Sequence, residues 1–179
     1  PLDPIRRWEL REGDGNKTVW GKFRDAAGNL SAVISASILL DSTPPEPVSR
    51  VFDEGEQSQS SALNFHWDAA TDLSGIQGYH VQLARDPEFR TVIYEGTVNE
   101  NRVQVSKTQG VTRSGDYYLR VKAINGVGLE SLWSPASDGI RLQLNEGVTG
   151  NVYVEPNPTS TPAVKLYLDV QDATEVRVA

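Results

Sequence analysis

The residues that could carry chemistry in this sequence are few, and they begin with two histidines. Cysteine is absent, which excludes disulfides, a thiolate metal site and a cysteine nucleophile. His66 and His80 stand next to Trp67 and Tyr79 in alternating stretches, so both imidazoles are predicted to point away from the core. Two histidines without further ligands make a poor metal site. We therefore expect surface roles for both, no catalytic residue, and no enzymatic activity in this chain.

Carboxylates offer a second kind of chemistry, the binding of calcium. Asp68 and Asp72 lie in the stretch WDAATDLSG, and such a loop can supply oxygen ligands to Ca²⁺. Asp at a turn also bonds its own backbone, and the sequence has no Asp-rich calcium-loop signature. Both interpretations stay open: Asp68 and Asp72 are the calcium candidates, turn geometry is the favoured alternative, and no other cofactor is expected.

Aromatic side chains that point outward are the candidates for an interaction surface. Trp20 is one, because Val19 and Phe23 already occupy the inward positions around it. Tyr118 is another, because it alternates with apolar neighbours in its own stretch. Together with Trp8 and Trp133, such rings can stack on sugars or contact a protein. Packing against a neighbouring domain is the favoured alternative for Trp20.

The composition limits the classes of protein to which this chain can belong. The 179 residues are 38% hydrophobic and 23% charged, with a formal net charge of −7, the profile of a folded globular chain with room for one domain and a remainder. The acidic balance argues against nucleic acid as a partner, because phosphate binding needs clustered Lys and Arg. No apolar run approaches the roughly 20 residues that span a bilayer, so we expect no membrane insertion.

Strand patterns dominate the sequence, and helix patterns are weak. Leu63, Phe65 and Trp67 alternate with polar residues, and the longest run of this kind covers residues 117–123. Turn formers such as Asn125-Gly126 separate the runs. Short alternating segments at intervals of about 8–12 residues predict an all-β chain built from β-sandwiches.

Two linkers divide the chain into three blocks. Residues 41–47 read DSTPPEP, and three prolines in four positions end any strand or helix there. Residues 145–151 read NEGVTGN, a run of turn formers. The predicted blocks are 1–43, 44–144 and 145–179, and only the middle one is long enough to bury a core of its own.

The middle block resembles a fibronectin type III domain of the bacterial extracellular kind over about residues 46–143. The stretches LNFHWDAATDLSGIQGYHVQLARD and GDYYLRVKAINGVGLESLWS carry the resemblance. It implies a structural core with Trp67 between the two sheets, Tyr79 on the third strand and Tyr117 at the tyrosine corner. The Tyr117 hydroxyl would then bond a nearby backbone group. The family needs no disulfide, which agrees with the absence of Cys.

The flanking blocks resemble parts of Ig-like domains. WELREGDGNKTVWGKFRDAAGNLSAVISASILLDSTPP is similar to the closing half of a bacterial Ig-like repeat, so residues 1–43 are expected to form the C-terminal part of an Ig-like β-sandwich. Gly21 departs from the pattern and predicts a weakened strand or a bulge. Residues 145–179 resemble the first strands of a sorting or hook-assembly-like Ig domain, incomplete here. Its features are a turn at 156–158 and strands at 164–168 and 176–179.

Two explanations are open for the incomplete flanks. The chain is a fragment of a longer protein, or strands of another chain complete one of its open sandwiches, as in donor-strand assembly. Exposed apolar edges of half-sandwiches motivate the second explanation, because they aggregate unless something covers them.

The resemblances imply a non-catalytic structural spacer or scaffold segment of a secreted or cell-surface multidomain bacterial protein. Its partners would be neighbouring domains of the same chain, and its location extracellular or at the cell surface. The alternatives are an adhesion module for polysaccharide or a cell-surface protein, an accessory segment of a secreted hydrolase, and a strand-exchanging filament subunit. An exposed row of aromatics favours sugar binding, whereas a surface without apolar patches favours the spacer.

Overall fold

The computed structural model describes residues 5, 7–60, 62–144, 149–155 and 165–171. These residues form strands and one 3₁₀ turn, with no α-helix among them, so the prediction of an all-β chain is confirmed. The elements are β1 (Gly15–Gly21), β2 (Ile34–Leu40), β3 (Val51–Phe52), β4 (Gln57–Ser58), β5 (Leu63–Trp67), β6 (Ile76–Ala84), β7 (Val92–Val98), β8 (Arg102–Val105), η1 (Lys107–Gln109), β9 (Gly115–Asn125), β10 (Ile140–Leu142), β11 (Thr149–Glu155) and β12 (Lys165–Gln171).

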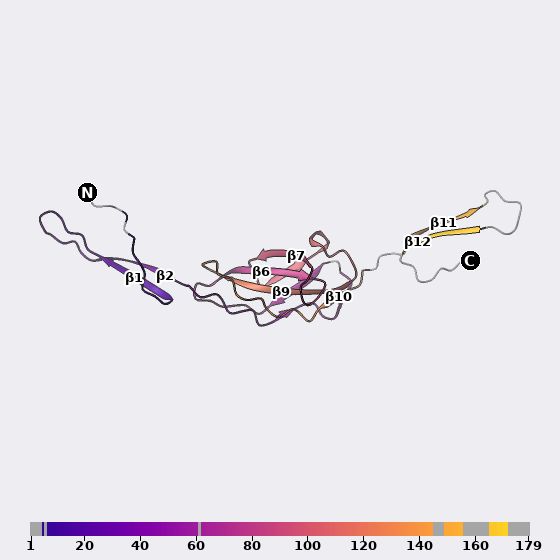
Figure 1. Ribbon diagram of the computed structural model, residues 1–179, viewed down its shortest axis with the longest axis horizontal. Helices are drawn as coiled ribbons and strands as arrows, with labels where there is room; N and C mark the ends of the chain where they lie inside the picture. The colour runs from indigo at the N-terminus through magenta and orange to yellow at the C-terminus, as the bar shows by residue number, and fades with distance from the viewer. Residues whose placement is uncertain (1–4, 6, 61, 145–148, 156–164, 172–179) are drawn as a thin grey trace. The chain divides into compact units, whose positions relative to one another are not determined.

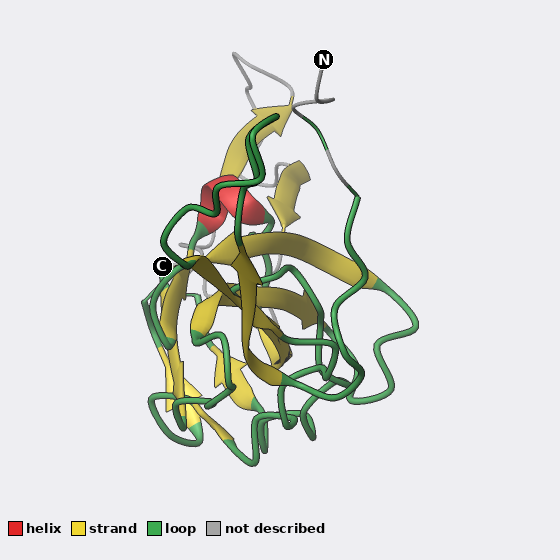
Figure 2. Cartoon of the chain, turned by 90° about the vertical axis from the view of Figure 1, so that its left-hand side faces the viewer, coloured by secondary structure: helices red, strands yellow, loops and turns green. Residues whose placement is uncertain are grey.

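The middle of the chain is a sandwich of two sheets (Figure 1, Figure 2). One sheet has the order β3-β5-β8, and the other has the order β4-β10-β9-β6-β7. The pairs β3/β5, β5/β8, β6/β7, β6/β9 and β9/β10 are antiparallel, and β4 runs parallel to β10. The edge strands are β3 and β8 in the first sheet and β4 and β7 in the second.

Period-two alternation explains the core between the sheets. In β9 every second residue from Tyr117 to Asn125 is buried, and the residues between them face outward. β5 alternates in the same way around Phe65. The fully buried large side chains of the sandwich are Trp67, Tyr117, Phe65, Leu63, Leu83, Leu119, Ile140, Leu142, Val48, Val81, Val105 and Val111. Their removal from water is the main driving force for folding of this part.

A serine ladder of Ser131, Ser134 and Ser137 bonds the segment before β10 to β9. The backbone N–H groups of these serines donate to Ala123 O, Val121 O and Leu119 O at 2.8–2.9 Å. Their hydroxyls accept the N–H groups of the same β9 residues at 2.9–3.2 Å. The serines recur every third residue, which is the period of polyproline II. The ladder thus satisfies the backbone of β9 although the segment forms no regular strand.

The flanking blocks contain hairpins. β1 and β2 pair in an unbroken antiparallel register, and Gly21 stands opposite Ile34. The bulge expected at Gly21 is therefore absent, because the neighbouring pairs hold the register through it. β11 and β12 also pair antiparallel, whereas the turn expected at 156–158 and the strand expected at 176–179 lie outside the described residues. By contacts the chain divides into two compact units, Pro1–Gln143 and Leu144–Ala179.

Candidate functional site

The two histidines lie in different sheets, so they do not form a common site. His66 is on β5 of the three-stranded sheet and is exposed, while His80 is on β6 of the other sheet. His80 Nε2 lies 2.6 Å from Glu95 Oε1, and His80 Nδ1 lies 3.7 Å from Glu130 Oε1. These carboxylates come from β7 and from the segment after β9. Among the described residues, no group of three or more His, Asp and Glu side chains has the geometry of a metal site.

The calcium candidates Asp68 and Asp72 are engaged in local hydrogen bonds. Asp68 Oδ2 lies 3.0 Å from the Ser49 hydroxyl, which donates to it. Asp72 Oδ1 accepts both the N–H and the hydroxyl of Ser74, at 3.1 and 3.0 Å. The second pattern is that of a turn in which Asp bonds the backbone two residues on. Calcium binding by Asp68 and Asp72 stays a prediction.

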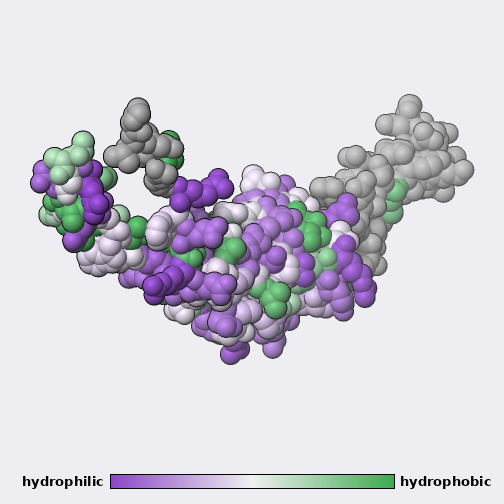
Figure 3. All heavy atoms as spheres, turned by 60° about the vertical axis from the view of Figure 1, so that its left-hand side comes forward, coloured by the Kyte–Doolittle hydropathy of each residue, from purple (hydrophilic) through white to green (hydrophobic). Residues whose placement is uncertain are grey.

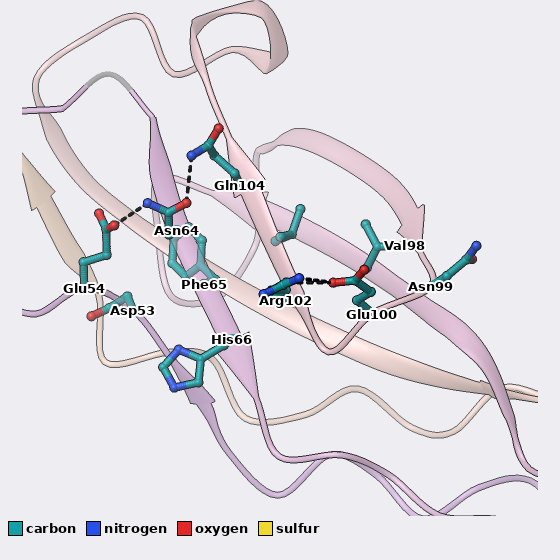
Figure 4. A pocket seen from close by; sticks show the side chains of 11 residues that line it. Asp53, Glu54, Asn64, Phe65, His66, Val98, Asn99, Glu100, Arg102 and Gln104 are labelled. Atoms are coloured by element: carbon teal, nitrogen blue, oxygen red, sulfur yellow. Dashed lines mark hydrogen bonds and ion pairs between the residues drawn. The ribbon is translucent and has the colours of Figure 1, made fainter.

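An open groove of about 930 Å³ lies on the outer face of β5 and β8 (Figure 4). Polar residues at outward positions of both strands line it together with Phe65, Val98 and Val103. Asn64 accepts a hydrogen bond from Gln104 Nε2 at 2.9 Å and donates one to Glu54. Arg102 binds Glu100 at 2.6 Å. Asn64, Gln104, Glu54, Arg102 and Glu100 therefore bind one another across this groove, and none of them is a nucleophile held by a base.

Asp53 at the edge of the groove has an unusual environment. Its Oδ1 accepts the N–H of Gly55 at 3.1 Å, but its Oδ2 is shielded from solvent and has no partner. Burial raises the pKa of the Asp53 carboxyl, and the charge of Asp138 raises it further. In the sequence Asp53 begins the acidic stretch DEGE, which is typical of a solvated loop. Its burial follows from the 138–139 segment, which is distant in sequence, so no local signal could reveal it.

The outer face of β6 and β9 carries a stack of rings and cations. The Arg120 guanidinium lies over Phe89 at 4.3 Å and over Trp133 at 4.5 Å, and Lys122 Nζ lies over the same indole at 4.8 Å. Arg120 also donates two hydrogen bonds to Gln82 Oε1, at 3.0 and 2.7 Å. The guanidinium thus contacts two rings and one amide, and burial lowers the pKa of Arg120. Arg120 and Lys122 both lie over rings of this stack, so neither cation is free to bind a ligand.

The aromatic residues predicted for the core lie inside the sandwich. Trp67 and Tyr79 meet edge to face, with ring centroids 5.2 Å apart. The Tyr79 hydroxyl accepts the N–H of Ala70 at 3.2 Å. The Tyr117 hydroxyl donates to Arg113 O at 2.7 Å, the bond of a tyrosine corner.

The residues predicted for an interaction surface lie in different environments. Tyr118 is half-buried, and its ring packs where a side chain at Gly139 would stand. Trp20 on β1 is 68% exposed, and Trp8 beside the hairpin is 72% exposed. Both tryptophans line a groove of about 690 Å³ together with Arg11, Lys17 and other residues. The sequence indicates both tryptophans as exposed aromatics, and their place in one groove follows from the structure.

Comparisons with known proteins give one family. A family model described as fibronectin type III domain matches residues 49–140. Similar solved structures include titin module A71 from human cardiac muscle, 26% identical over 55% of this chain and 92% of that one, with a TM-score of 0.43. Domains A168–A170 of titin are 18% identical over 77% of this chain and 49% of that one, with a TM-score of 0.48.

Two longer proteins, a chitinase and a kinase region, also contain parts that are similar to this chain. A chitinase from Bacillus thuringiensis is 17% identical over 64% of this chain, with a TM-score of 0.43, and the match spans only 16% of that chitinase. The C. elegans twitchin kinase region is 15% identical over 60% of this chain, with a TM-score of 0.45, and the match spans 18% of that chain. Among curated proteins, none matches significantly. In the described part of the chain, no helix is long and apolar enough to cross a membrane.

Proposed function

Because this chain belongs to the fibronectin type III family, we propose that it is a non-catalytic spacer segment of a secreted or cell-surface multidomain bacterial protein. Its role would be to hold neighbouring domains of the same chain at a fixed separation. The family is a common structural module, and the location outside the cell comes from the same resemblance.

The observation that carries the proposal is the position of the entry and exit of the sandwich at opposite ends of β9. Asn125, the last residue of β9, bonds Asp41 in the entry linker. Gly115, the first residue of β9, pairs with Leu142 at the end of β10, where the chain leaves the sandwich. The 11 residues of β9 extend over about 34 Å at the usual strand rise. A chain that enters at one end and leaves at the other is suited to separate its neighbours.

The surface of the sandwich also supports a spacer. The groove on β5 and β8 has paired polar groups at Asn64, Gln104, Arg102 and Glu100, and the cations of the stack on β9 are also paired. The unpaired Asp53 Oδ2 is shielded from solvent. The large apolar residues exposed on the sandwich are Leu73 and Val127, in two neighbouring turns, and Leu132. In Figure 3 the visible face of this part is mostly hydrophilic with scattered hydrophobic spots. A ligand-binding face would instead present a contiguous patch or unpaired polar groups.

A second candidate function is adhesion to polysaccharide, favoured by the groove that Trp8 and Trp20 line. Exposed indole rings stack on sugar faces, and Arg11 and Lys17 in the same groove would suit an acidic sugar. Retention of the purified chain on immobilised acidic and neutral polysaccharides separates the two functions. The spacer proposal expects no retention. Retention that is lost in Trp20→Ala and kept in Leu132→Ala, a matched change of another exposed apolar residue, would overturn it in favour of adhesion.

A further inference from the structure

The linker between the β1–β2 hairpin and the sandwich is held from the hairpin side by one carboxylate. Asp14 immediately precedes β1. Its Oδ1 accepts the N–H and the hydroxyl of Ser42 at 2.8 and 2.6 Å, and its Oδ2 accepts the Thr43 hydroxyl at 2.5 Å. Three donors of the linker thus converge on a single side chain. A free tether would expose these donors to water instead.

The linker is held from the sandwich side by Asn125. The Asn125 side chain is fully buried, and its Nδ2 donates to Asp41 Oδ2 at 3.1 Å and to Thr43 O at 3.2 Å. Its Oδ1 accepts the N–H groups of Val127 and Leu129 at 3.2 and 2.8 Å. Every hydrogen-bonding position of the amide is therefore used. Asp41 is 8% exposed, so the linker is seated in the sandwich at this point.

Two turns of the sandwich, at residues 72–75 and 125–128, form the seat for the linker. Gly126 N donates to Gly75 O at 3.0 Å, and a Cβ at Gly126 would stand 2.3 Å from Ser74 O. The turns are thus packed backbone against backbone. The Ser74 hydroxyl also lowers the pKa of the Asp41 carboxyl. Leu73 and Val127 are half-exposed in the same two turns.

We propose that this end of the sandwich is a docking surface for the module that contains the β1–β2 hairpin, and that the joint formed by Asp14, Asp41, Asn125 and the linker fixes the orientation of that module. The inference rests on the proposed spacer function and adds how the spacer controls direction as well as separation. The occupant is identified by continuity, because β2 ends at Leu40 and the anchored residue is the next one. No residue lies between Leu40, where the hairpin ends, and Asp41, which is bonded to the sandwich.

Proline supports the same conclusion in the rest of the linker. Pro44, Pro45 and Pro47 fix three backbone φ angles, and Pro45 is buried. A flexible seven-residue linker would let its ends vary over about 15 Å. Prolines and side-chain anchors together remove most of that freedom.

Acid should loosen the joint. The pKa of the Asp14 carboxyl is held below its ordinary value, first by the Ser42 hydroxyl and then by Thr43, with Lys17 contributing. The pKa of the Asp41 carboxyl is also held low, first by the Ser74 hydroxyl, with Asp72 beside it. A lowered pKa means that the folded joint prefers the ionised form. Its contribution is present above about pH 4, the ordinary pKa of Asp, and is lost as the pH falls below that value.

The test is the distribution of distances between spin labels on the two sides of the joint. The chain has no cysteine, so Ser35→Cys on β2 and Thr97→Cys on β7, both exposed, give a single labelled pair in the full chain. A chain with residues 43–47 replaced by Gly and Ser provides the flexible reference. We expect a narrow distribution in the parent and a distribution about twice as wide in Asp14→Asn and Asp41→Asn, approaching the reference.

Two variants keep the test decisive. Asp25→Asn is the matched control, because Asp25 holds Asn29 in a hairpin turn in the same way but lies outside the joint; its distribution should match the parent. Thr43→Val removes one hydroxyl bond to Asp14 without a change of shape and should broaden the distribution even if an Asp variant misfolds. A parent distribution as wide as the flexible reference would overturn the joint. It would leave the spacer function standing, since that function depends on the span of the sandwich and on the absence of ligand retention.

Discussion

Replacing Ser134 by alanine should reveal how much the serine ladder contributes to the sandwich. Ser134 Oγ accepts the N–H of Val121 at 3.0 Å, and Val121 is fully buried in the middle of β9. Alanine removes the acceptor and leaves this N–H without a partner where water cannot reach it. An unsatisfied buried group of this kind costs about 1–3 kcal/mol. The backbone bond from Ser134 N to Val121 O at 2.8 Å remains, so the fold should survive.

Chemical denaturation followed by tryptophan fluorescence measures the loss. For a domain of this size the expected decrease corresponds to about 5–15 °C in the melting temperature. Pro135→Ala is the matched control, because Pro135 is the next residue, is exposed and has no N–H to lose. Amide exchange should localise the effect, with Val121 N–H exchanging faster in Ser134→Ala.

The outcome that refutes the ladder is a Ser134→Ala chain within about 0.5 kcal/mol of the parent, the range of ordinary surface changes. Ser131→Ala and Ser137→Ala extend the test to both neighbours. Residues three apart in an extended segment of this period are about 9 Å apart, so the three losses should add when they are combined in pairs. A strongly non-additive pair would mean that the segment detaches as a unit.

Three further predictions concern the core and the buried carboxylate. Trp67→Ala should lower the free energy of unfolding by about 3–5 kcal/mol, as other large core truncations do, and a denaturation curve like that of the parent would contradict the position of Trp67 between the sheets. Tyr117→Phe should cost about 1 kcal/mol because the bond to Arg113 O is lost; an unchanged midpoint would show that this bond contributes nothing. Asp53→Asn should raise the unfolding midpoint at pH 7, because the raised pKa of Asp53 means that its charge destabilises the folded state as pH rises through that pKa. The gain should vanish at acid pH, where Asp53 is already neutral, and a gain equal at both pH values would contradict burial of the charge.

Strand positions and the core follow from the sequence because alternation is a local signal. The run from Tyr117 to Asn125 shows its buried face directly, and Trp67 shows the same for β5. Tertiary partners are not local, which is why the sequence missed the environment of Asp53. The role of Asn125 is a similar case: the sequence places it in a turn, but its side chain bonds Asp41 and Thr43, which are 84 and 82 residues away.

The serine ladder lies between these cases. The period of three formed by Ser131, Ser134 and Ser137 is visible in the sequence. It matches neither the helix period of about 3.6 nor the strand period of about 2, so it does not predict a regular element. A period of three next to a predicted edge of a sheet is the signal that would have revealed the ladder, because polyproline II can run along a strand without forming one.

The central claim, a sandwich that separates its neighbours by a fixed span, is tested most directly by one distance. Spin labels at Val127→Cys, beside the entry, and Gln143→Cys, at the exit, lie near the two ends of β9. The account predicts a single narrow peak at about 35–40 Å, the length of β9 plus the label arms, unchanged by added polysaccharide. A peak below about 25 Å, or one that shifts when polysaccharide is added, would contradict a spacer whose entry and exit lie at opposite ends of its longest strand.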